Sequence, residues 1–195
     1  MMNQLEGSVR ATAVLTLALL LLLFLPAVAS AQVAPRLDVF GGYSYLRFDA
    51  PSIGIANYAN LNGWNIDAAA NITQRWGVAI DVSGHYGSQL TLYHYMIGPQ
   101  YTWRRDKSKF FVHGLFGKAQ NRVDVAQPSL SDFKSVGRAF AAGGGFDYDW
   151  RPRWSIRVFQ ADYVNSSTFA ATQHDVRVST GVVFHFGHIG HTPRL

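Results

Sequence analysis

Hydrophobic and polar residues alternate along the last long segment of the chain, residues 175–186. One register of that segment is apolar apart from a threonine and contains Val176, Val178, Thr180, Val182, Phe184 and Phe186. The other register is mostly polar and contains Arg177, Ser179, Gly181 and His185. A period of two residues indicates a β-strand with one apolar and one polar face. At roughly 3.3 Å per residue the segment would reach nearly 40 Å, about twice the length of an ordinary strand. A tilted strand needs only about 9–11 residues to cross a bilayer.

Seven earlier segments show the same alternation, and the chain therefore predicts eight strands. Their ranges are 36–48, 61–72, 76–86, 90–103, 110–122, 136–150 and 154–164. The pattern does not decide which face of the segment 110–122 is which. Pro99 cannot donate to a β-ladder, so we expect a local bulge there. Gln160 and Asp162 fall in the apolar register of their strand, and a bulge near Phe159 would restore the alternation.

The connections between these segments alternate, for the most part, between short and long. Short turns are expected at 73–75, 104–109 and 151–153, whereas 49–60, 123–135 and 165–174 read as polar loops rich in turn-forming residues. The link at 87–89 is also short, although it falls on the side of the long loops. An even number of strands places both ends of the sheet on one side. The sequence thus predicts an all-β, antiparallel, up-and-down barrel of eight strands.

The first 31 residues have the pattern of a cleaved signal peptide. Arg10 precedes an apolar run from Ala11 to Leu25, Pro26 ends the run, and Ala29 and Ala31 supply the small residues of a cleavage site. No other stretch reads as a membrane helix, so a mature chain that enters a membrane must do so as a closed barrel. We therefore expect a signal peptide at 1–31, a barrel at 32–187 and a short tail at 188–195.

Composition narrows the possible functions. The chain has 195 residues, of which 48% are hydrophobic and 15% charged, and it contains no cysteine. The lack of cysteine excludes a disulfide scaffold and any thiolate metal site. The formal charge is +5, but the basic residues are scattered apart from the turn at 104–109. A nucleic-acid surface would need them clustered on one face, so no nucleic-acid partner is expected.

Alternation alone does not say which face of the barrel is outside. A secreted, soluble, lipocalin-like barrel places its apolar side chains inside, whereas a membrane barrel places them outside. Large aromatic residues at the predicted strand ends favour the membrane barrel, because such barrels carry aromatic girdles at the membrane interfaces. The predicted girdle consists of Trp76, Tyr86, Trp103, Trp150, Trp154 and Phe186.

The polar register also suits the interior of a narrow barrel. Eight strands enclose a space just wide enough for side chains to fill, and the glycines and alanines of 137–145 would leave room there for larger groups. Charged residues of both signs would point inward, and buried charges must be paired. We predict a network in the lumen formed by Asp67, Asp81, Asp147, Arg157 and Arg177.

Taken together, these segments resemble small bacterial outer-membrane β-barrels, the broad class of the OmpA transmembrane domain and of OmpX-like and opacity-type, porin-like surface proteins. The likeness lies in the opening FGGYSYLRF, the hairpin GGGFDYDWRPRWSIRVFQADY and the closing VRVSTGVVFHFG, and it spans the mature chain. It implies a location in the bacterial outer membrane, contact with outer-membrane lipid, and insertion by the barrel-assembly machinery. Members of this class usually end on an aromatic residue that looks like the signal for that machinery, whereas here nine residues follow Phe186.

The leading functional expectation is a monomeric, non-enzymatic barrel that stabilises the envelope or presents its loops to an external ligand of unknown identity. A narrow porin-like channel, a secreted soluble lipid carrier and, more remotely, an outer-membrane lipid-modifying enzyme remain as alternatives. His85 with Ser83, or His94, would be the candidates for catalysis, but any alternating polar pair would share a face in this way. The spacing of His185, His188 and His191 is weak evidence for a metal site. No catalytic residue, cofactor or metal is therefore assigned.

Overall fold

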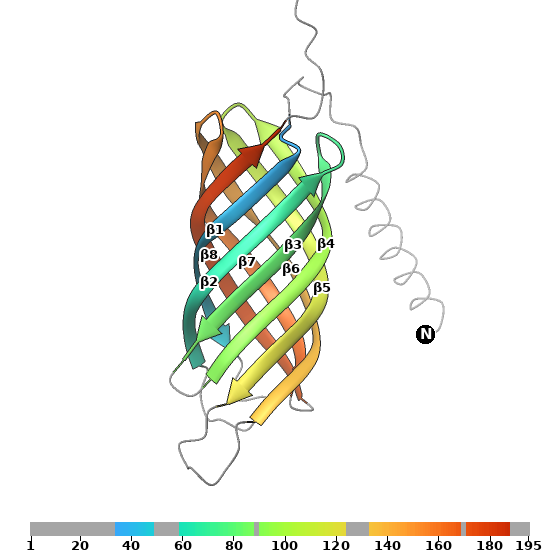
Figure 1. Ribbon diagram of the computed structural model, residues 1–195, viewed down its shortest axis with the longest axis vertical. Helices are drawn as coiled ribbons and strands as arrows, with labels where there is room; N and C mark the ends of the chain where they lie inside the picture. Colours follow the sequence, from blue (N-terminus) through green and yellow to red (C-terminus); the bar gives the residue numbers. More distant parts are fainter. Residues whose placement is uncertain (1–33, 49–58, 88–89, 124–132, 169–170, 188–195) are drawn as a thin grey trace, which may run out of the picture. The chain divides into compact units, whose positions relative to one another are not determined.

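The protein is a closed barrel of eight antiparallel strands, in which each strand pairs with the next and β8 pairs with β1. The computed structural model describes residues 34–48, 59–87, 90–123, 133–168 and 171–187. Figure 1 shows β1 lying between β2 and β8, which closes the sheet and leaves no open edge. The strands are β1 (Leu37–Phe48), β2 (Ala59–Asn71), β3 (Trp76–Tyr86), β4 (Leu90–Arg105), β5 (Ser108–Val123), β6 (Phe133–Arg151), β7 (Trp154–Thr168) and β8 (Ala171–Phe186).

The predicted strand number, order and fold class are confirmed, but one predicted loop is wrong. The segment 165–174 is almost entirely strand, because β7 continues to Thr168 and β8 begins at Ala171. Ser166, Thr168 and Gln173 of this segment face the lumen, where Gln173 accepts hydrogen bonds from Ser166 at 3.1 Å and from Thr168 at 2.8 Å. In a barrel with a polar interior, polar residues at inward positions do not mark a loop. The predicted signal peptide at 1–31 and tail at 188–195 lie outside the described residues.

Of the two predicted bulges, the structure contains one. The pairing of β6 with β7 shifts register between Phe146 and Asp147, and that of β7 with β8 shifts between Arg157 and Gln160, so the bulge near Phe159 is confirmed. The bulge at Pro99 is wrong. The β4–β5 register is the same at Ile97 and at Gln100 on either side of it. The ladder omits the pairs at Gly98 and Pro99 and gains no extra residue.

The two faces of the strands differ in the way expected of a membrane barrel. On β8 the apolar side chains of Val176, Val178, Val182 and Phe186 are exposed on the outer face, while Arg177 is fully buried inside. Large apolar side chains are likewise exposed on the outer face of all the other strands. Within the described part of the chain there is no helix long and apolar enough to cross a membrane.

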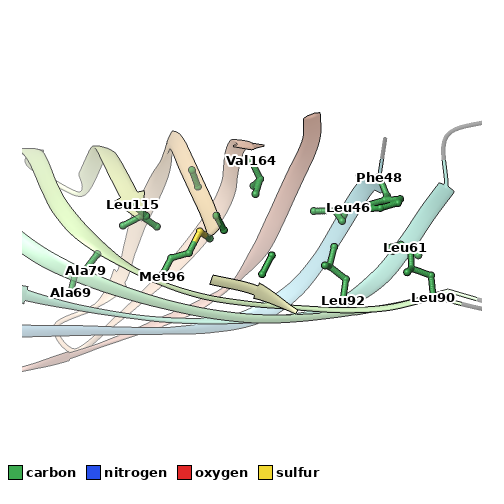
Figure 2. Close-up of a cluster of buried hydrophobic side chains, with 13 residues drawn as sticks. Leu46, Phe48, Leu61, Ala69, Ala79, Leu90, Leu92, Met96, Leu115 and Val164 are labelled. Atoms are coloured by element: carbon green, nitrogen blue, oxygen red, sulfur yellow. The ribbon is translucent and has the colours of Figure 1, made fainter. Parts of the chain in front are cut away.

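The interior is not polar throughout. A cluster of buried apolar side chains includes Leu46, Phe48, Leu61, Leu90 and Leu92, and Figure 2 shows these five gathered where β1 ends and β2 and β4 begin. The alternation of the sequence did not predict this apolar layer, because these residues occupy inward positions, for which the pattern predicted polar side chains.

The two ends of the barrel are distinguished by their connections. One end carries the turns between β2 and β3, β4 and β5, and β6 and β7, together with the start of β1 and the end of β8. We call it the turn end, and the opposite end the loop end. In outer-membrane barrels the short turns are periplasmic and the longer loops extracellular.

Candidate functional site

The centre of the lumen is organised around Arg177 of β8. Its guanidinium donates to Asp81 on the far side of the barrel at 2.7 and 2.9 Å, and to Asp162 of β7 at 2.9 and 2.7 Å. A fifth bond, of 3.0 Å, goes to the hydroxyl of Ser83. A guanidinium has five N–H groups, so every donor of Arg177 is used. The group therefore ties three strands together across the interior.

A second cation, Arg157 of β7, lies in the same lumen and is also buried. It donates to Asp147 of β6 at 2.8 and 3.2 Å and to Gln160 at 2.6 Å. Its guanidinium carbon is 4.3 Å from the ring centroids of both Phe40 and Phe111, so the cation is held between two aromatic faces. The aromatic rings fill space that would otherwise admit water.

A third polar cluster closes the lumen at the turn end. Lys109 contacts Asp149 at 2.7 Å, and His185 of β8 lies 2.5 Å from Asp38 of β1. The ammonium of Lys109 also lies 3.0 Å from the ring of His185, which joins the two pairs. Arg104 lies 3.5 Å from the Asp38 carboxylate. The cluster thus draws together strands from opposite sides of the barrel.

The structure places all five predicted network residues in the interior. Asp81 pairs with Arg177, and Asp147 pairs with Arg157. Gln160 links the two pairs, because it accepts a hydrogen bond from Arg157 and donates one to Asp162, which in turn pairs with Arg177. Asp67 stands apart: it is buried, neither of its carboxylate oxygens has a hydrogen bond, and its nearest cation is Arg157 at 3.9 Å. It also lies directly opposite Asp81 in the β2–β3 ladder.

The prediction missed Asp162, which bridges Arg177 to His113. The carboxylate of Asp162 lies 2.7 Å from the guanidinium of Arg177 and 2.8 Å from the ring of His113. The bulge near Phe159 was the available signal, because restoring the alternation beyond it turns Gln160 and Asp162 inward.

The catalytic candidates are tied into the packing of the lumen. His85 contacts Ser44 at 2.9 Å, and the nearest approach of His94 to Ser83 is 3.5 Å. Ser83 also accepts the bond from Arg177, which fixes its hydroxyl in the central cluster. Among the described residues no three His, Asp or Glu side chains converge as a metal site would need. His188 and His191 lie outside those residues.

The predicted girdle residues are all exposed on the outer face, but they belong to two belts. Tyr86 is at the loop end of β3, whereas the others lie at the turn end, namely Trp76, Trp103, Trp150, Trp154 and Phe186. The loop-end belt consists mainly of residues that the prediction missed. In it the indole of Trp64 donates to Tyr86 at 3.1 Å, and Tyr86 contacts Tyr93 at 3.2 Å. Tyrosines and tryptophans with a polar atom in contact suit a membrane–water interface.

An outward apolar surface bounded by two aromatic belts, around a lumen filled by ion pairs, defines a β-barrel of the bacterial outer membrane. The family described as "Outer membrane protein beta-barrel domain" matches residues 15–186, and the chain belongs to this family. Its place is accordingly the outer membrane, and a secreted soluble carrier is excluded.

Solved structures support the fold. Neisserial surface protein A matches with a TM-score of 0.61 and 16% identity over 77% of this chain and 97% of its own. Ail, the attachment invasion locus protein of Yersinia pestis, solved with the heparin analogue sucrose octasulfate, matches with a TM-score of 0.54 and 16% identity. That alignment covers 77% of this chain and 99% of Ail. A search of curated protein sequences gave no match. At these identities the similarity concerns the fold alone.

Proposed function

We propose that this protein is a sealed, non-enzymatic barrel that stabilises the outer membrane and presents its loop end to the exterior. The observation that carries the proposal is the occupied lumen. Arg177 reaches across the interior to Asp81, Arg157 pairs with Asp147 on the neighbouring strand, and both arginines are 2% exposed or less. An eight-stranded barrel has an interior just wide enough for side chains to fill, and here large side chains fill it.

The seal has two layers of different chemistry. At mid-height Arg157, Arg177, Asp81, Asp147 and Asp162 are paired at hydrogen-bonding distance inside the barrel. Towards the loop end Leu46, Phe48, Leu61 and Leu92 are buried against one another. An ion on its way through would have to displace both layers. The narrow channel is therefore the less favoured function.

The expected partners follow from the same geometry. The segments 49–58 and 124–132 join strands at the loop end, and either would be placed to contact an external ligand of unknown identity. The third predicted loop, 165–174, is strand in the residues that the structure describes, because β7 ends at Thr168 and β8 begins at Ala171. Phe186 ends β8 at the turn end, where it would meet the barrel-assembly machinery as the last aromatic residue of the barrel. We propose that the barrel functions as a monomer.

Planar-bilayer recording tests the sealed lumen. The folded chain, verified by its heat-modifiable mobility on a gel, should give no unitary current steps above those of the detergent alone. Heat-unfolded protein in the same detergent is the matched control. Reproducible unitary current steps that appear only with folded protein would show that the protein is a narrow channel and that the lumen is not sealed. Lipid modification that depends on His85 or His94 would instead support an enzyme.

A further inference from the structure

Four basic side chains lie together on the outer face of β5 and β6, near the loop end. They are Lys118, Arg122, Lys134 and Arg138, all exposed, and we call them the basic patch. The ladder places them in two like-charged rows, with Lys118 directly opposite Arg138 and Arg122 directly opposite Lys134. Like charges directly opposite each other in an antiparallel pair are destabilising. The arrangement therefore calls for an anion that lies between them.

The described outer face supplies no such anion. Every aspartate of the described strands points into the lumen, and those strands contain no glutamate. None of the four basic side chains has a hydrogen bond or ion pair with another described residue. Asp124 and Asp132 belong to the connecting segment outside the described residues. Even if both reached the patch, they would leave two of its four positive charges unbalanced.

The position of the patch along the barrel identifies its surroundings. The next outward pair towards the turn end is Phe116 opposite Phe140, whose side chains are 61% and 51% exposed and face the hydrocarbon. Across the other edge of β5, Tyr93 of the loop-end aromatic belt lies opposite Gln120, midway between the two rows of the patch. Aromatic belts mark the level of the lipid headgroups. The patch is therefore centred at headgroup depth, on the side of the membrane that carries the extracellular loops.

We propose that the basic patch binds the phosphate groups of a phosphorylated glycolipid of the outer leaflet. Arginine forms paired, charge-assisted hydrogen bonds with phosphate, and lysine adds a mobile point charge, so each row supplies one of each. The rows are four residues apart along the strand, or roughly 13 Å at 3.3 Å per residue. Two phosphates on one headgroup, or on neighbouring headgroups, can thus be held at once. Phe116 and Phe140 lie next to the patch on the side of the turn end, where the acyl chains of the same lipid begin.

Binding of purified diphosphorylated lipid A to the folded barrel in phosphatidylcholine nanodiscs tests this assignment. The comparison lipid is lipid A with both phosphates removed. We expect the diphosphorylated lipid to bind at least about tenfold more tightly than the dephosphorylated lipid, a difference of about 1.4 kcal/mol. Equal binding of the two lipids by the unaltered chain would overturn the proposal without any variant. Displacement of bound lipid by inorganic phosphate at the concentration of the lipid would also overturn it, because it would show a simple anion site.

Two double variants locate the site. Lys118→Gln with Arg138→Gln should remove most of the preference for the phosphorylated lipid. Arg105→Gln with Lys107→Gln removes the same charge at the turn end and should leave the preference unchanged. Heat-modifiable mobility establishes that each variant is folded. If both variants lost the preference equally, the net charge of the protein would account for binding and the patch would not be the site. These outcomes do not depend on whether the lumen conducts.

Discussion

Replacement of Arg177 by methionine is the most severe test of the central ion-pair cluster. Methionine keeps much of the side-chain length but removes the charge and all five donors. The substitution leaves Asp81 and Asp162, each 2% exposed or less, without their principal counter-ion. Removing one partner of a buried pair typically costs about 3–5 kcal/mol. With two carboxylates stranded, we expect a loss of at least that size.

A loss of that size is readily measured. At about 1.4 kcal/mol per factor of ten, the ratio of folded to unfolded protein falls at least about 100-fold. Urea titration of the barrel in vesicles, followed by tryptophan fluorescence and by heat-modifiable mobility, should show the shift in midpoint. Arg105→Met removes an exposed arginine at the turn end and should change stability by no more than about 0.5 kcal/mol.

A triple variant separates loss of charge balance from loss of packing. Arg177→Met combined with Asp81→Asn and Asp162→Asn removes all three charges and keeps carbonyl acceptors for the side chains that donate to the two aspartates, such as Asn65 and Gln160. We expect it to recover at least half of the loss. If the triple variant is as unstable as Arg177→Met alone, stranded charge is not the cause and the reasoning fails. The same would follow if Arg177→Met cost no more than Arg105→Met.

Three further predictions concern other parts of the barrel and are measured by the same urea titration. Asp67→Asn should be neutral or stabilising, because the carboxylate has no hydrogen bond and faces Asp81. Asp147→Asn should lower the free energy of unfolding by about 1–3 kcal/mol, because it weakens the two bonds to Arg157. The reverse order would show that Asp67 is the better-paired group. Val178→Arg should cost about 2–4 kcal/mol, since the side chain faces lipid at the middle of β8, and a cost near zero would mean that the outer face had been misassigned. Gly42→Ala should lower the free energy of unfolding by about 1–3 kcal/mol, because its added methyl would lie 2.1 Å from the carbonyl oxygen of Thr180. Gly41→Ala on the outer face should be tolerated, because its methyl meets nothing within 4 Å. Equal effects would contradict the close packing of β1 on β8.

The fold could be predicted because a lipid-exposed strand carries a strong local signal. Each strand must be apolar on one face along its whole membrane-spanning length, so alternation is visible without knowledge of its neighbours. The faces of β8 were predicted residue by residue and are confirmed. The error at 165–174 arose beyond the apolar band, where outward positions are no longer apolar and inward Ser166 and Gln173 look like loop residues.

The interior could be predicted only in part, since it depends on which strands face each other across the barrel. Inward parity located Asp81 and Arg177, but their contact joins residues 96 positions apart and has no local signature. Asp162 was missed because a single extra residue near Phe159 reverses the parity beyond it. The faces of β5 became clear only from the ladder, which places Phe111 and His113 inside.

Site-directed spin labelling of β8 tests most directly the claim that the apolar register faces lipid and the polar register faces a filled lumen. The chain has no cysteine, so single cysteines placed one at a time at residues 178–180, 182 and 183 give one label each. We predict that collision with oxygen, which dissolves in lipid, alternates with a period of two and is high at Val178, Thr180 and Val182. Labels at Ser179 and Val183 should collide little with oxygen or with a water-soluble nickel reagent, because the lumen is filled. Strong collision of the inward labels with the nickel reagent would reveal an open aqueous lumen, and an inverted alternation would show that the faces are reversed.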